Sequence, residues 1–164
     1  MARLNKKFFE QNTLKVAREL LGKILARKLP AGKNGQSKII RGIVTETEAY
    51  KGISDRASHA SRGVTPRNAI MFGQAGRAYV YLIYGMHHCL NIVTERNGYP
   101  AAVLIRSVVL TGELPAIDTH KSHLWVRGPG RVCKFFHIDK TLNGEDITKS
   151  KKLWIENTPL NLKI

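Results

Sequence analysis

Two glutamates and a tyrosine alternate in the segment Glu46-Thr47-Glu48-Ala49-Tyr50, and their side chains are well suited to chemistry. In an extended strand this alternation places Glu46, Glu48 and Tyr50 on one face. Glu48 lies where the expected strand ends, and sites are commonly built where loops begin. A carboxylate close to flat aromatic rings suits a nucleobase that is held by stacking while water attacks nearby. The alternative is a solvated edge residue, which is what we expect of Glu46.

Tyr84 has an unusual position, because it ends an expected strand beside Gly85 at the tip of a hairpin. Residues 78–84 and 87–94 are rich in aromatic and β-branched residues, and only two residues separate them, which predicts a tight hairpin. A tyrosine at this tip either folds back over its own hairpin or points outward. In the second case it would act as a wedge between stacked bases. The residues alone allow both interpretations.

Histidine and cysteine do not have the spacing of a metal site. Adjacent His87 and His88 face opposite sides of a strand, and the chain has no Cys-x-x-Cys pair. Glycine motifs for nucleotides and a serine-centred nucleophile elbow are also absent. We therefore expect no metal and no cofactor. The histidines and cysteines that could be metal ligands by residue type are His87, His88, Cys89, His120, His123, Cys133 and His137.

The composition describes a strongly basic chain of 164 residues, with 27 Lys and Arg against 12 Asp and Glu and a formal net charge of +15. Hydrophobic residues make up 43% and are mixed with the charges, which argues against a disordered basic tail and allows one folded core. A surface of this kind attracts polyanions, because contact with phosphates releases condensed counterions. Nucleic acid is the favoured partner. An anionic membrane surface is second, and a basic protein without a polyanion is the plain alternative.

Periodicity and turn residues predict a single strand-rich α+β domain that spans residues 1–164. Asn12-Thr13 can cap a helix that Gly22 ends, and Thr65-Pro66 opens a short helix. Residues 52–65 are expected to be irregular. The expected strands are 23–29, 39–50, 78–84, 87–94, 101–109 and 152–156, and the longer helices are 14–21 and 130–137. The chain has no run of eighteen apolar residues, so we expect no membrane span. Its two cysteines are too few for a disulfide framework and favour a reducing compartment.

Three stretches together resemble one known family. They are Glu46–Tyr50, the segment Thr65-Pro66-Arg67-Asn68-Ala69-Ile70-Met71-Phe72, and the segment Tyr79-Val80-Tyr81-Leu82-Ile83-Tyr84-Gly85-Met86. The chain is similar to the alkyladenine (3-methyladenine, hypoxanthine) DNA glycosylases from about Leu4 to about Glu156. The resemblance implies one domain around a curved, mostly antiparallel sheet with flanking helices and a protruding hairpin at about 79–94.

The resemblance also implies roles for single residues. Glu48 would activate water, and Arg106 would help to hold that water. The flipped base would lie between Tyr50, His59 and Tyr81, while Tyr84 fills the vacated place in the stack beside Met86. Asn91 would crowd the amine of guanine, and Leu104 would line the same pocket. No lysine matches a pocket position, which favours hydrolysis without a Schiff base. The arginines expected to contact phosphates, or else to be solvated, are Arg62, Arg67, Arg127 and Arg131.

The resemblance predicts a monofunctional DNA glycosylase that removes alkylated or deaminated purines from double-stranded DNA and so initiates base excision repair. We expect a monomer in the cytoplasm, associated with the nucleoid and not with a membrane. Family members usually continue with segments resembling R-I-G-V and P-W-R-F-Y, so a shortened C-terminus is expected here. The alternatives are a homologue that binds damaged DNA without cutting it and a general RNA-binding protein.

Overall fold

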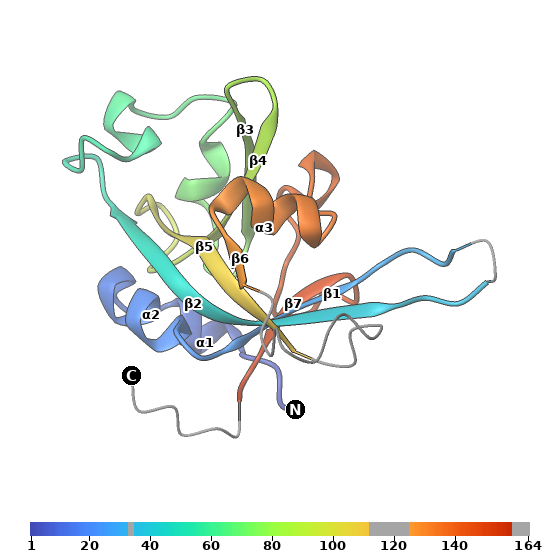
Figure 1. Cartoon of the computed structure of the whole chain (residues 1–164). Helices are drawn as coiled ribbons and strands as arrows, with labels where there is room; N and C mark the ends of the chain where they lie inside the picture. Colours follow the sequence, from blue (N-terminus) through green and yellow to red (C-terminus); the bar gives the residue numbers. More distant parts are fainter. Residues whose placement is uncertain (33–34, 112–124, 159–164) are drawn as a thin grey trace.

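Seven antiparallel strands form one sheet within the residues that the structure describes (Figure 1). The structure is a computed structural model that describes residues 1–32, 35–111 and 125–158. The strands are β1 (Ile24–Lys28), β2 (Ile39–Lys51), β3 (Ala78–Ile83), β4 (His87–Val93), β5 (Ala101–Thr111), β6 (Trp125–Arg127) and β7 (Leu153–Glu156). Their order is β3-β4-β5-β2-β1-β7, and β6 pairs with β5. The predicted α+β class and antiparallel sheet are confirmed.

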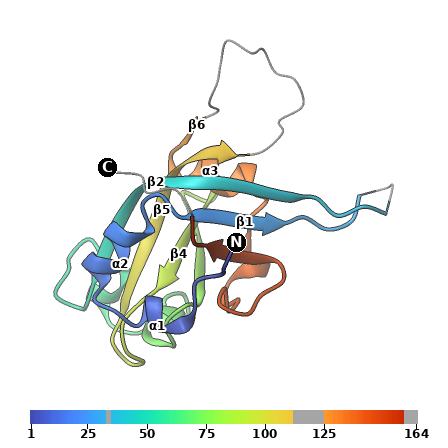
Figure 2. The same cartoon turned by 90° about the horizontal axis from the view of Figure 1, so that it is seen from below.

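Helices cover the sheet, and several of them are short. The α-helices are α1 (Lys6–Phe9), α2 (Thr13–Leu20) and α3 (Pro129–Phe135), and the 3-10 helices are η1 (His59–Arg62), η2 (Ala69–Phe72) and η3 (Lys140–Leu142). Seen from below, α1 and α2 lie together on one side of the molecule, and β1 and β2 extend away from them (Figure 2). None of the described helices is long and apolar enough to cross a membrane.

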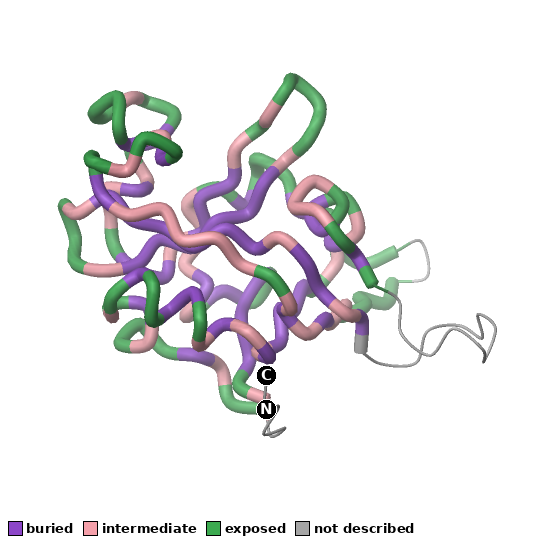
Figure 3. The backbone as a smooth tube through the Cα atoms, turned by 60° about the vertical axis from the view of Figure 1, so that its left-hand side comes forward, coloured by how far each residue is buried: buried purple, intermediate pink, exposed green. Residues whose placement is uncertain are grey.

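The two faces of the sheet bury different groups of side chains. The larger core includes Leu90 of β4, Ile105 of β5, Leu20 of α2 and Val132 of α3. A smaller cluster on the other face joins Tyr79 and Ala102 of the sheet to η1 and η2. Alternation along each strand explains the division, because neighbouring residues point to opposite faces. Buried residues fill the centre of the sheet, whereas the hairpin tip is exposed (Figure 3).

Most of the expected elements are found within two residues of their predicted ends. The Asn12 side chain accepts a hydrogen bond from the Leu14 amide and caps α2, and Gly22 follows this helix with a φ of 80°. The short helix expected to open at Thr65-Pro66 begins later, because a turn occupies residues 66–68 and η2 begins at Ala69. The Thr65 hydroxyl accepts a hydrogen bond from the Asn68 amide at 3.3 Å, as expected of a cap. The Asn68 side chain bonds to the Thr65 amide and fixes this turn. Neither α1 nor β6 was predicted, since both are too short for a periodic pattern.

A buried carboxylate ties β7 to β2. Glu156 on β7 is 5% exposed, and its carboxylate accepts hydrogen bonds from the Arg41 guanidinium at 3.1 and 3.3 Å. Trp154 Nε1 donates to the same group at 2.7 Å. A buried charge is tolerated only when it is paired and hydrogen-bonded, and here three donors serve that purpose.

The chain itself pairs with both outer strands of the sheet. Beside β3, the Ala78 amide donates to Glu145 O at 2.9 Å and the Gly144 amide donates to Ala78 O at 2.7 Å. Beside β7, the Leu4 amide donates to Ile155 O at 2.9 Å. Backbone groups that would otherwise be unpaired are thus bonded within the chain along parts of both edges.

Candidate active site

Four paired residues form a row across the sheet, each on a different strand. Tyr79 of β3 pairs with Asn91 of β4, which in turn pairs with Leu104 of β5. Leu104 pairs with Glu48 of β2. Residues that are directly opposite in neighbouring strands point to the same face. The register therefore brings together Glu48, Asn91 and Leu104, to which the family resemblance or the sequence assigned roles. The fourth residue of the row, Tyr79, belongs to the smaller buried cluster.

Both carboxylate oxygens of Glu48 have a hydrogen-bond donor. The Tyr50 hydroxyl donates to Oε2 at 2.7 Å, and Arg106 Nη1 donates to Oε1 at 2.6 Å. Burial and the bond to Glu48 raise the pKa of Tyr50, so its hydroxyl stays protonated and remains a donor. The Glu48 side chain is 40% exposed, so water can reach it. A carboxylate fixed in this way can accept a proton from water or stabilise a nearby positive charge.

Arg106 lies at an irregularity in the pairing of β2 and β5. The register shifts on both sides of Glu46, and Arg106 has no partner residue on β2. Irregularities of this kind redirect side chains and are common next to active sites. Arg106 Nε donates to Glu46 Oε1 at 3.1 Å while Nη1 bonds to Glu48, so the guanidinium lies between two carboxylates. Glu46 is thus more than the solvated edge residue that we expected.

His59, the first residue of η1, packs against the aromatic residues of β3. Its ring centroid lies 4.5 Å from that of Tyr81, in an edge-to-face contact, and its Nδ1 shares a 2.9 Å hydrogen bond with the Tyr79 hydroxyl. Burial lowers the pKa of His59, and the positive charges of Arg67 and Arg62 lower it further. The neutral imidazole is therefore favoured. Tyr79 and Tyr81 stay protonated, because burial raises the pKa of each to about 12.

A small cavity separates Tyr50 from this aromatic wall. Its volume is about 30 Å³, and its lining residues are Tyr50, Ala57, His59, Met71, Tyr79 and Tyr81. The cavity is narrow, and it is partly open to solvent. The predicted base-pocket residues Tyr50, His59 and Tyr81 are brought together around it.

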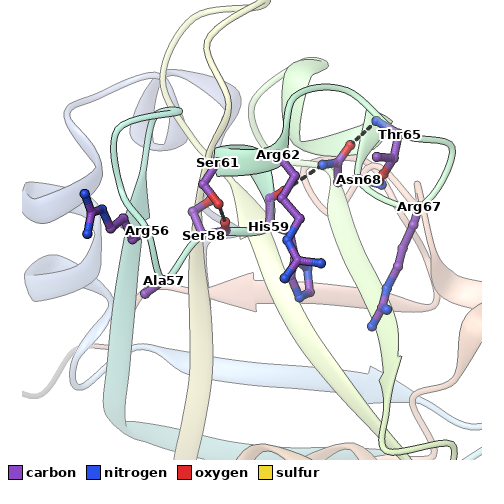
Figure 4. Close-up of a pocket in the computed structure, with 9 residues that line it drawn as sticks. All are labelled: Arg56, Ala57, Ser58, His59, Ser61, Arg62, Thr65, Arg67 and Asn68. Atoms are coloured by element: carbon purple, nitrogen blue, oxygen red, sulfur yellow. Dashed lines mark hydrogen bonds between the residues drawn. The ribbon is translucent and has the colours of Figure 1, made fainter.

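A larger cavity of about 390 Å³ adjoins the small one, because Ala57 and His59 line both. Figure 4 shows the side chains of Arg56, Arg62 and Arg67 around it. Its volume lies in the range of small-molecule sites. No carboxylate is among its lining residues, so the cavity suits an anionic group.

Asn68 organises the loop that carries His59, a role that our sequence analysis did not identify. Its Nδ2 donates to His59 O at 2.9 Å, and its Oδ1 accepts from the Thr65 amide at 2.6 Å (Figure 4). Nδ2 also donates to Gly63 O at 2.8 Å. Asn68 is 2% exposed, so its side chain bridges three backbone groups inside the loop. The preference of asparagine for turns was the available signal.

Two further predicted pocket residues are buried in the row across the sheet. Leu104 is 3% exposed and Asn91 is 2% exposed. Asn91 Nδ2 has no hydrogen-bond partner within the described part of the chain. A buried donor without a partner is unusual, because it loses its bonds to water. Its neighbour is the Tyr81 hydroxyl, because a contact from Asn91 partly offsets the burial that raises the pKa of Tyr81.

The β3–β4 hairpin protrudes from the sheet (Figure 1), and the residue at its tip is an exposed aromatic one. Tyr84 and Gly85 both have positive φ, at 53° and 69°, and the Met86 amide donates to Ile83 O at 3.2 Å, as in a type I′ turn. Tyr84 is 84% exposed and Met86 is 69% exposed. Of the two orientations that the sequence allowed, Tyr84 takes the outward one.

Comparisons with known proteins agree with this arrangement. Residues 7–163 match the family model described as methylpurine-DNA glycosylase (MPG). A protein of Methanocella arvoryzae, named "Putative 3-methyladenine DNA glycosylase", is 47% identical over 168 residues, which cover 98% of this chain and 80% of that protein. Proteins with the same name from Ehrlichia ruminantium and Desulfitobacterium hafniense are 48% and 40% identical, over 97% and 100% of this chain and 76% and 84% of their own lengths.

This chain belongs to the methylpurine-DNA glycosylase family. The resemblance inferred from the three motifs is confirmed, and membership supports a DNA glycosylase. Glu48, Tyr50 and Tyr84 of those motifs lie in the site and at the hairpin tip described above.

The arginines expected to contact DNA phosphates in this family member lie on the surface. Arg67 is fixed by its neighbours, since Nη2 donates to Leu82 O at 2.6 Å and the guanidinium lies 5.4 Å from the centre of the Tyr81 ring. Arg127 lies 5.0 Å from the centre of the Trp125 ring. All four predicted arginines are exposed, and they are Arg62, Arg67, Arg127 and Arg131.

The candidate metal ligands do not gather in the part of the chain that is described. No group of three or more His, Cys, Asp or Glu side chains there could hold a metal ion. His120 and His123, which were weighed as ligands, lie outside the described residues.

Proposed function

We propose that this protein is a monofunctional DNA glycosylase that removes damaged purines, such as 3-methyladenine and hypoxanthine, from double-stranded DNA. The observation that carries the proposal is the Glu48 carboxylate, which Arg106 and Tyr50 orient beside an aromatic cluster. The names of the relatives support the substrate class. Among the described residues, no lysine lines the aromatic cavity, which favours water over an amine as the nucleophile.

In the proposed reaction, water attacks C1′ of the sugar while the bond from C1′ to the base nitrogen breaks. Glu48 takes a proton from the water and stabilises the positive charge that develops on the sugar. The base leaves with the electron pair of the broken bond. An alkylated base is already cationic and leaves neutral, whereas hypoxanthine takes up a proton as it leaves. Arg106 keeps the Glu48 carboxylate oriented and helps to hold the water.

Binding of the base would widen the aromatic cavity. A base stacked between Tyr50 on one side and His59 with Tyr81 on the other needs roughly 3.4 Å to each face, the spacing of stacked bases. The present cavity is narrow, with a volume of about 30 Å³. We propose that the loop carrying His59 moves outward as the nucleotide enters, and that Asn91 then meets the edge of the base.

Electrostatic attraction and the hairpin tip would assist flipping. Extruding a nucleotide requires a few kcal/mol, and least for a damaged base. The net charge of +15 and the exposed arginines Arg62, Arg67, Arg127 and Arg131 favour phosphate contact. Tyr84 would enter the stack where the nucleotide was, with Met86 beside it. We propose that the protein acts as a monomer.

The deciding experiment measures release of free base from a duplex with one hypoxanthine, incubated with excess purified protein. We expect hypoxanthine to appear in solution and the abasic strand to stay uncut until alkali is added. Tight binding without release would favour the alternative, a homologue that only binds damaged DNA. RNA competing as well as the lesion duplex would favour a general RNA-binding protein.

Substituting Tyr84 tests the wedge. Tyr84→Ala should weaken binding to the hypoxanthine duplex by about tenfold and slow base release by a similar factor, because the stacking contribution is lost. Both residues have a Cβ, so the strained turn is affected little. Tyr84→Phe is the matched control and should retain both properties, since the ring remains. Fluorescence anisotropy with labelled duplexes measures the affinity, and equal losses in both variants would contradict a stacking role.

A further inference from the structure

Glu46 is one of two carboxylates that contact Arg106, and nothing above gives it a role. Its Oε1 accepts from Arg106 Nε at 3.1 Å, while Arg106 Nη1 reaches Glu48 Oε1 at 2.6 Å. The side chains of Glu46 and Glu48 are 53% and 40% exposed, and that of Arg106 is 33% exposed. Arg106 also has no partner residue on β2, so the ladder of backbone pairs constrains its position less than that of its neighbours.

The planar guanidinium makes the second contact important. Its five N–H groups lie in a rigid fork, so fixing Nε fixes the directions of the others. An arginine with a single carboxylate neighbour tends to bond to it with two parallel N–H groups. In that geometry Arg106 would occupy both oxygens of Glu48 and compete with the Tyr50 hydroxyl for Oε2. In the structure Nε is bonded to Glu46, and Nη1 is the group that bonds to Glu48.

We propose that Glu46 is a positioning residue that holds Arg106 to a single contact with Glu48 and so leaves part of the Glu48 carboxylate free to take a proton from water. This inference rests on the proposed function of Glu48. Glu46 itself does not touch the reacting atoms. What Arg106 needs at this position is a hydrogen-bond acceptor, and the negative charge is secondary.

The proposal separates two substitutions of Glu46. Glu46→Ala removes the acceptor, and we expect single-turnover base release to fall about tenfold while the affinity for the lesion duplex stays within twofold. Glu46→Gln retains a carbonyl acceptor and should stay within threefold of the wild-type rate. In an Arg106→Ala background, adding Glu46→Ala should change the rate by less than twofold, because Glu46 acts through Arg106. Glu10→Ala, which removes a surface glutamate paired with Lys6, is the control.

A measurement independent of catalysis decides the positioning itself. With ¹⁵N-labelled arginine, the Arg106 Nε–H signal should be shifted and protected from exchange in the wild type. We expect the signal to keep these properties in Glu46→Gln and to lose them in Glu46→Ala. An unchanged signal in Glu46→Ala, or additive effects of Glu46→Ala and Arg106→Ala on the rate, would overturn the proposal. If the wild type releases no base, the proposed function fails, and the spectra still decide whether Glu46 positions Arg106.

Discussion

Glu48→Gln is expected to slow base release from a hypoxanthine duplex by at least about a thousandfold, because a glutamine can neither take a proton from water nor stabilise a positive charge on the sugar. The substitution preserves the size of the side chain and leaves an acceptor for Arg106 Nη1 or for the Tyr50 hydroxyl. Single-turnover release with excess protein measures the effect, and it excludes differences in product release.

Binding provides the control for this substitution. We expect Glu48→Gln to bind the lesion duplex at least as tightly as the wild type, since one negative charge near the DNA is removed. Glu19→Gln, on the exposed side of α2 and paired with Lys15, should change neither property. Release by Glu48→Gln at the wild-type rate would remove Glu48 from the mechanism, whereas loss of both release and binding would point to a disturbed fold.

Arg41→Ala is expected to lower the free energy of unfolding by about 3 kcal/mol, because it leaves the buried Glu156 carboxylate without its charged partner. Trp154 Nε1 would still donate to Glu156, but it carries no charge. Urea unfolding monitored by tryptophan fluorescence measures the change. Arg18→Ala, which removes an exposed arginine of α2, should stay within about 0.5 kcal/mol of the wild type.

Unfolding measurements at acidic pH test why Arg41→Ala lowers the free energy of unfolding. Burial alone would raise the pKa of Glu156, but the bonds from Arg41 and Trp154 outweigh burial and hold its pKa below the ordinary value of 4.5. A lowered folded-state pKa stabilises the protein above the unfolded-state value, and this stabilisation is lost as the pH falls through the folded-state value. The stabilities of wild type and Arg41→Ala should therefore converge on acidification. A gap that stays constant down to pH 3 would argue for lost packing instead.

Strand periodicity predicted the parts of the site that depend on alternation. Glu46, Glu48 and Tyr50 share a face, as their spacing indicated. The pattern also predicted the β3–β4 hairpin, but it left the orientation of Tyr84 open, and the structure has this side chain exposed. Arg106 was assigned by resemblance to the family, and periodicity alone could not place it beside Glu48. The register of β2 against β5 shifts near Glu46, and such shifts depend on the tertiary structure.

Periodicity in the sequence could not predict the structure of the loop around His59. Irregular segments have no repeat from which a facing direction can be inferred, and three bonds from the Asn68 side chain fix this one. The narrowness of the aromatic cavity was not predicted either, because a volume of about 30 Å³ depends on the positions of single rings. The roles assigned to these residues stay predictions until the variants are measured.

The bonding along β3 and β7 has a consequence for crowding on DNA. A strongly cationic protein accumulates along a polyanion, where neighbouring copies meet at high local concentration. Open strand edges would then allow copies to join into intermolecular sheets. Here the amides of Leu4 and Ala78 are already engaged within the chain, which leaves fewer backbone groups for such templating. The proposed binding to DNA is therefore compatible with copies that separate again.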